Sequence, residues 1–188
     1  MKFYMKLQDW LAGPFSQKMQ KFMQNPYMHA LQVCFTIILP MIMVGSLASL
    51  VNTFRNFAPW LPDLSLINSF SFGLISIFMA FLIPYTIMES KKLQKQKMIT
   101  GFASVSALIA LANPQYVDGN LVINSGYVGT GGMTVAMVMG LVIGWLFSAY
   151  FKHGLFKKDS SLPSVVVVWF ESILIIFVLI LVCIIIGQ

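Results

Sequence analysis

The sequence predicts an all-α membrane protein with about five transmembrane helices preceded by an amphipathic interfacial helix. Two observations carry this prediction, namely the composition and the placement of the charges. Of the 188 residues, 58% are apolar and only 10% are charged, whereas soluble domains carry about 25% charged residues. Too few polar groups are available to cover a water-soluble fold, and the same composition excludes a disordered chain.

Residues 1–24 precede the first long apolar run and predict a helix that lies in the membrane interface. Their apolar residues recur at helical spacing, while lysines and glutamines take the other face. A bend is expected at Gly13-Pro14. The segment lacks the compact apolar core and small-residue cleavage site of a signal peptide. An anchor is the simplest interpretation of this helix, and a gating element is the alternative.

Residues 25–188 are expected to form one membrane domain, because a helix of roughly 20 apolar residues crosses a bilayer core. Five apolar runs meet or approach that length: 28–51, 64–88, 98–112, 132–151 and 165–187. The third is short and rich in small residues, so it either crosses with little tilt or is partly re-entrant.

The segment between the third and fourth runs predicts two small elements outside the helices. Polar and apolar residues alternate around Asp118-Gly119-Asn120, which is typical of a hairpin. The glycines from Gly126 to Gly132 predict a turn that leads into the fourth run. A phosphate-binding loop is excluded there, since no Lys-Ser or Lys-Thr pair follows.

The basic residues alternate with the apolar runs and predict the topology. Eleven of the twelve precede the first run or lie between the second and third or the fourth and fifth: Lys2, Lys6, Lys18, Lys21, Lys91, Lys92, Lys95, Lys97, Lys152, Lys157 and Lys158. Arg55 alone lies elsewhere. The positive-inside rule then predicts a multi-pass protein with a cytoplasmic amino terminus and an external carboxyl terminus. The net charge of +6 favours the lipid bilayer, with its anionic headgroups, over nucleic acid as partner.

Glu171 is the one acid inside a predicted span, and intramembrane acids are costly and often functional. It either serves a function or pairs with a polar group of a neighbouring helix or subunit. His29 is its closest titratable candidate partner, so these two residues form the candidate intramembrane polar site. Cys34 and Cys183 have no CxxC or histidine partner, which argues against a metal site or disulfide. No catalytic residue, cofactor or metal is predicted, and the protein is not expected to be an enzyme.

Small residues at helical spacing predict close packing between helices. The fourth run contains Gly140 and Gly144 in a GxxxG pattern, and Gly45 begins a similar pair with Ser49 in the first run. Such spacing lets two helix backbones approach closely. It favours tight packing in general and, less specifically, a homodimer.

Four stretches in order resemble the lactose/cellobiose-type membrane permeases (subunit IIC) of the bacterial phosphotransferase system. The stretches are Asn25-Pro26-Tyr27-Met28 through Pro40 and Val44-Gly45-Ser46; Ile83-Pro84-Tyr85 with the basic loop; Gly126-Tyr127-Val128-Gly129 and Gly132 through Ile143; and Leu162-Pro163-Ser164-Val165-Val166 with Phe170. The resemblance covers nearly the whole chain. It implies a bacterial cell-membrane protein of sugar transport, with cytoplasmic phosphotransferase subunits as partners.

The chain departs from that family in two ways. Members are more than twice as long, and the chain resembles only their amino-terminal half, which mainly forms the scaffold and dimer interface. The carboxyl half supplies most of the sugar site, so no sugar-binding residue is carried over. In the fifth run, moreover, Val167, Val168 and Trp169 replace polar or basic residues, and Glu171 follows.

Three interpretations follow from the resemblance and its limits. The first is a half-permease that pairs with a second polypeptide carrying the substrate site. The second is a non-transporting scaffold, receptor or regulator that dimerises or binds another membrane protein. The third is a truncated or degenerate gene product. Under all three, the chain alone is expected to move no sugar.

Overall fold

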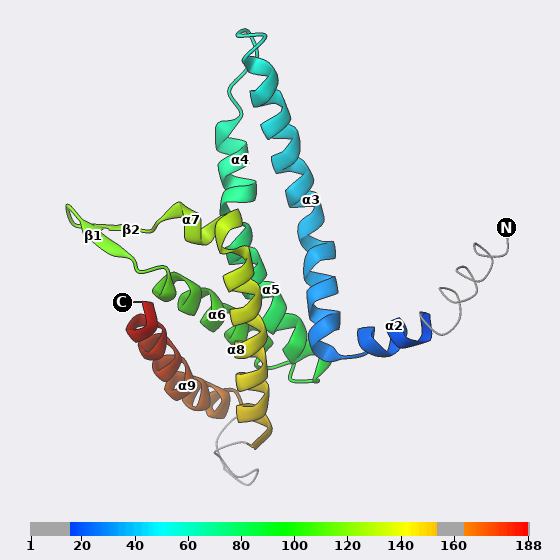
Figure 1. The fold of residues 1–188 in the computed structure, drawn as a ribbon. Coiled ribbons are helices and arrows are strands. Elements are labelled where there is room, and N and C mark those ends of the chain that lie inside the picture. The colour runs from blue at the N-terminus through cyan, green and yellow to red at the C-terminus, as the bar shows by residue number, and fades with distance from the viewer. Residues whose placement is uncertain (1–15, 154–163, 188) are drawn as a thin grey trace, which may run out of the picture.

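The computed structural model of the protein describes residues 16–153 and 164–187, which are mostly helical (Figure 1). The elements in chain order are α2 (Ser16–Met23), α3 (Pro26–Arg55), α4 (Ser65–Ser71), the 3₁₀ turn η2 (Phe72–Leu74), α5 (Ile75–Ser90), α6 (Lys97–Leu111), β1 (Gln115–Val117), β2 (Asn120–Val122), α7 (Ser125–Val128), the 3₁₀ turn η3 (Thr130–Gly132), α8 (Met133–His153) and α9 (Ser164–Gly187).

Four helical stretches are long and apolar enough to cross a membrane: Pro26–Arg55, Ser65–Ser90, Thr130–Lys152 and Val168–Gly187. They coincide within a few residues with the predicted runs 28–51, 64–88, 132–151 and 165–187, so the fold is that of a helical membrane protein. The fifth predicted run, 98–112, is the 15-residue helix α6. At 1.5 Å per residue α6 is about 22 Å long, which is shorter than a bilayer core of roughly 30 Å.

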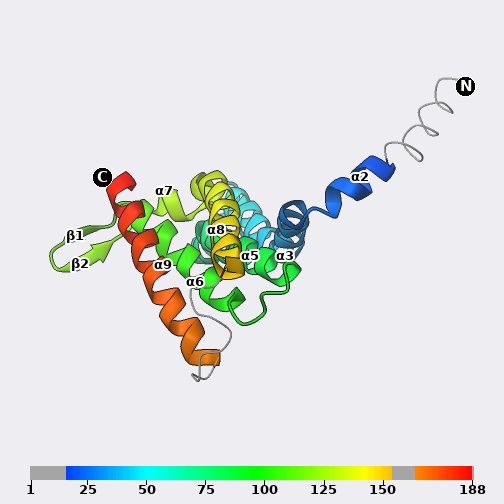
Figure 2. The ribbon, with the colours of Figure 1, turned by 90° about the horizontal axis from the view of Figure 1, so that it is seen from below.

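Helix α5 lies at the centre of the bundle and packs against α3, α6 and α8. Its fully buried side chains include Met79, Ile83 and Ile87, and Ile38 of α3 joins the same apolar cluster. Helix α9 packs chiefly along α6. Seen from below, α3 and α9 therefore lie on opposite sides of α5, α6 and α8 (Figure 2).

The described lysines gather at one end of the bundle, which we call the lysine end. The α5–α6 connection (91–96), the last turn of α8 and helix α2 all lie there (Figure 1). Arg55 lies at the opposite end, where it forms an ion pair of 2.8 Å with Asp63. The Ser65 backbone N–H, which donates to Asp63, and the Arg55 guanidinium lower the pKa of the Asp63 carboxyl.

Local signals in the sequence explain several boundaries. The Asn25 side chain accepts from the Tyr27 backbone N–H and Pro26 occupies the first turn, so α3 begins there. Asn113 adopts the left-handed conformation with φ of 47° and ends α6. Asp118 and Gly119 have φ of 49° and 79°, as a type I′ turn requires, and the predicted hairpin is confirmed as β1–β2.

Only part of the predicted amino-terminal interfacial helix lies within the described residues. Helix α2 stands away from the bundle (Figure 2), and its Met19 and Phe22 are exposed. An apolar surface on such a short helix suits the membrane interface. Residues 1–15, with the expected bend at Gly13-Pro14, lie outside the described residues.

Helices α3 and α4 rise beyond the other helices at the end opposite the lysines, and we call residues 47–71 the outer arm (Figure 1). Helix α3 has 30 residues and is therefore about 45 Å long, against a bilayer core of roughly 30 Å. The outer arm nevertheless exposes large apolar side chains, among them Phe57 (85% exposed) and Trp60 (83%). Both side chains lie in the connection between α3 and α4, where no other described helix packs against the arm.

Candidate functional site

The second predicted span is a broken helix rather than a continuous one. Helix α4 ends at Ser71, the chain makes the 3₁₀ turn η2, and α5 begins at Ile75. Asn68, Ser69, Ser71 and Gly73 lower the helix propensity of this stretch. The Ser71 hydroxyl also donates to the Ile67 carbonyl at 2.7 Å, a local bond that bends helices.

Gly45 of α3 allows the break to lie close to its neighbour. A Cβ added at Gly45 would lie 2.6 Å from the Phe72 ring and 2.7 Å from the Ser71 hydroxyl. Only a residue without a side chain therefore lets η2 pack directly on α3. The structure thus places Gly45 at the α3–η2 contact within one chain.

A second interruption, α7–η3, faces the first. The Ser76 hydroxyl donates to the Gly129 carbonyl at 2.5 Å, and both groups are buried. A Cβ added at Gly132 would collide with the Tyr127 carbonyl oxygen. The glycines predicted to form a turn into the fourth run therefore hold α7 against the start of α5.

A cavity of about 460 Å³ lies between the two interruptions, and we call it the break pocket. Its lining combines polar side chains with glycine-rich backbone: Asn68, Ser69, Phe72, Gly73, Leu74, Ile123, Gly126, Val128, Gly129, Thr130 and Gly131. The Asn68 Oδ1 is buried without a hydrogen-bond partner in the described part of the chain. A pocket with amide and hydroxyl groups but no charged lining residue is suited to hydrogen-bonding a neutral polar molecule.

The break pocket lies at the starts of α5 and α8, far from the lysine end. Helix α5 has 16 residues and α8 has 21, so the pocket is about 24–31 Å from the lysine end. That distance is close to a full bilayer core. Between the pocket and the lysine end, the buried contacts of α3, α5 and α8 are mainly apolar, and Thr86 of α5 and Ser148 of α8 are buried polar residues on this stretch.

The hydrogen bond from Ser76 to Gly129 allows a direct test of the contact between the two interruptions. We expect Ser76→Ala to lower the free energy of unfolding by about 1–2 kcal/mol, because the buried Gly129 carbonyl loses its partner. The measurement is thermal unfolding of the purified protein in mild detergent. Ser106→Ala, at an exposed position of α6, is the matched control. Equal stability of the two variants would contradict the bond.

The structure does not bring Glu171 and His29 together. His29 Nδ1 lies 3.4 Å from the Ser90 hydroxyl between α3 and α5. Glu171 is buried on α9 (6% exposed), and α9 lies on the other side of the bundle from α3 (Figure 2). Tyr150 lies beside it, and the Tyr150 hydroxyl donates to the Glu171 backbone carbonyl at 3.2 Å. The candidate pairing with His29 came from similar depth along two helices, and depth does not determine which helices are neighbours.

Gly140 and Gly144 face α5 of the same chain. A Cβ at Gly140 would lie 3.0 Å from the Ile83 Cβ, and one at Gly144 would lie 2.6 Å from the Ile87 Cδ1. The GxxxG pattern therefore serves the α5–α8 contact inside the molecule.

A cluster that the sequence did not reveal lies at the lysine end. The Lys91 ammonium donates to the Tyr27 hydroxyl at 2.6 Å and to the Ser148 hydroxyl at 2.7 Å, which joins α5 to α3 and α8. It also lies 4.6 Å from the centre of the Tyr27 ring. In the sequence Lys91 was only one charge of a basic loop, and no periodicity distinguished it from Lys92.

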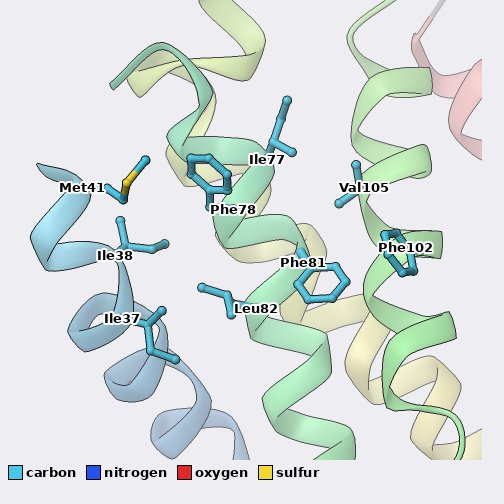
Figure 3. Close-up of a pocket in the computed structure, with 9 residues that line it drawn as sticks. All are labelled: Ile37, Ile38, Met41, Ile77, Phe78, Phe81, Leu82, Phe102 and Val105. Carbon is cyan, nitrogen blue, oxygen red and sulfur yellow. The ribbon is translucent and has the colours of Figure 1, made fainter. Parts of the chain in front are cut away.

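An open apolar groove of about 470 Å³ separates α3, α5 and α6 (Figure 3). Its lining is entirely apolar: Ile37, Ile38, Met41, Ile77, Phe78, Phe81, Leu82, Phe102 and Val105. Without a polar group the groove cannot orient a polar solute. It therefore adds no second candidate pocket for one.

No family model, no curated protein and no solved structure matches the chain. Within residues 16–153 and 164–187, no group of three His, Cys, Asp or Glu side chains could hold a metal ion. The function is therefore inferred from the chain's own sequence and geometry.

Proposed function

We propose that the protein is one component of a membrane sugar permease of the phosphotransferase type, a half-permease that acts with a second polypeptide. The outer arm is the observation that carries this proposal. A helix about 45 Å long exceeds the bilayer core, yet the arm ends in exposed residues such as Phe57 and Trp60. Exposed apolar side chains on a part of the molecule that extends past the thickness of a bilayer core are suited to a contact with another protein.

Two further features support a transport assembly rather than an autonomous carrier. Facing helix interruptions around a polar pocket are typical of transporters, and α4–η2–α5 and α7–η3 form such a pair. In transporters, however, the substrate site lies near the midplane, whereas the break pocket is at one edge. A partner polypeptide would supply the central site.

The proposal includes an orientation and a set of partners. The lysine end faces the cytoplasm of a bacterial cell, in agreement with the positive-inside rule. Cytoplasmic phosphotransferase subunits supply phosphate there, and the chain itself catalyses no step.

Site-specific photocrosslinking in membranes tests the half-permease. A crosslinker at Trp60 in the outer arm should capture a second, different membrane polypeptide, while one at Ile185, an exposed position on α9, should capture mainly lipid. The purified chain alone in liposomes should take up no disaccharide. Uptake by the chain alone would refute the proposal. Capture of a second copy alone would instead favour the dimerising scaffold.

A further inference from the structure

The Lys91 ammonium is partly buried and has no carboxylate partner among the described residues. The ion pairs among the described residues are Arg55–Asp63 and Lys97–Glu89. Glu89, the acid nearest in sequence, is thus held by Lys97 at 2.8 Å. The Lys91 ammonium donates two hydrogen bonds to hydroxyl oxygens, which leaves one of its three protons without a described acceptor. A cation withdrawn from water without a counter-charge is costly, and a bound anion would offset that cost.

The groups around Lys91 are arranged as hydrogen-bond donors. Because the Tyr27 oxygen accepts from Lys91, its own O–H proton is left to donate outward. On the preceding residue, the Ser90 hydroxyl lies 3.4 Å from His29 Nδ1, which adds a hydroxyl and a ring nitrogen at the same end of α5. A phosphate group, with several acceptor oxygens and negative charge, complements such a set.

The backbone holds Lys91 in place. The Leu93 N–H bonds to the Met88 carbonyl at 2.9 Å and the Lys92 N–H bonds to the Glu89 carbonyl at 3.0 Å, which is the Schellman pattern at a helix end. Lys92 accordingly takes the left-handed conformation with φ of 61°. Its side chain is exposed, while that of Lys91 turns back to α3 and α8.

We propose that Lys91, together with Tyr27 and the Ser90–His29 pair, binds a phosphate group. The group belongs either to the headgroup of an anionic phospholipid or to a soluble phosphate. The common alternative for a lysine at this place is a favourable interaction with the carboxyl end of the α5 dipole. That interaction would act on Lys92 as much as on Lys91, so the two neighbours provide a matched comparison.

The experiment compares Lys91→Gln with Lys92→Gln, two full-length variants of the same net charge. Each is purified in neutral detergent, and its thermal unfolding is followed in two titrations. One adds phosphatidylglycerol, with phosphatidylcholine as the uncharged control. The other adds inorganic phosphate at constant ionic strength, with chloride as the control. Stabilisation by phosphatidylglycerol alone identifies a lipid headgroup, and stabilisation by inorganic phosphate identifies a soluble ligand.

We expect Lys92→Gln to bind like the unaltered protein and Lys91→Gln to bind about tenfold or more weakly, as the loss of a charge-assisted hydrogen bond implies. If Lys91→Gln does not fold, Tyr27→Phe replaces it, because that variant keeps the charge and removes one donor; it should also weaken binding. Equal responses of the Lys91 and Lys92 variants would overturn the site. So would a phosphate response unaffected by Tyr27→Phe, or no stabilisation by either ligand.

Discussion

Replacing Gly144 with leucine should lower the free energy of unfolding by about 3 kcal/mol. A Cβ at this position would lie 2.6 Å from the Ile87 Cδ1, 3.2 Å from the Ile87 Cβ and 3.3 Å from the Pro84 Cα. The Ile87 methyl can rotate away, but the backbone at Pro84 cannot. The α5–α8 contact must therefore open along its length, and it is the largest in the bundle.

The control for Gly144→Leu is Val142→Leu on the same helix, at a side chain that is 54% exposed. That change should alter the free energy of unfolding by no more than about 0.5 kcal/mol. Thermal unfolding in detergent gives the stability of each variant, and native mass spectrometry gives its oligomeric state. A loss of dimer with unchanged stability would show that the glycines serve a contact between two chains instead.

The sequence predicts well those features that depend on local signals or on composition. The lengths of the apolar runs follow from the cost of polar groups in a bilayer, and four of the five runs are helices long enough to cross. The β1–β2 hairpin follows from Asp118-Gly119, because few residue pairs accept two positive φ angles.

The break at η2 is not predictable from hydropathy, which measures transfer from water and contains no information on backbone angles. The polar residues Asn68, Ser69 and Ser71 at the start of the run do indicate that its helix is weak there. The exact position of the break depends on Gly45, 27 positions before Phe72, and on the Gly129 carbonyl that Ser76 reaches. Such long-range contacts are set by the packing of the helices.

The candidate site shows the same limit. Glu171 and Lys91 are both visible in the sequence as charges near apolar runs. Which residue each one meets depends on the rotation of its helix and on which helices are neighbours. Lys91 joins three helices only because the turn after α5 directs its side chain inward.

Gly132→Ala should be as damaging as Gly144→Leu although it adds a single methyl group, at about 3 kcal/mol. The added Cβ would collide with the Tyr127 carbonyl oxygen and lie 2.6 Å from the Tyr127 carbonyl carbon. Since both are backbone atoms, α7 itself must move. Gly73→Ala, in the same break pocket, is the matched control. Its Cβ would meet nothing nearer than the Ser69 Cβ at 3.9 Å, so stability should change by less than about 0.5 kcal/mol.

The double variant Ser76→Ala/Gly132→Ala separates the two contacts that the new methyl group makes. The Cβ at position 132 would also lie 3.0 Å from the Ser76 hydroxyl, and removal of that hydroxyl relieves this contact but leaves the collision with the Tyr127 backbone. If the backbone collision dominates, the two losses should add to within about 0.5 kcal/mol in thermal unfolding. If the double variant is instead as stable as Ser76→Ala alone, the methyl group acts only through the hydroxyl, and α7 does not pack on η3 as the structure has it.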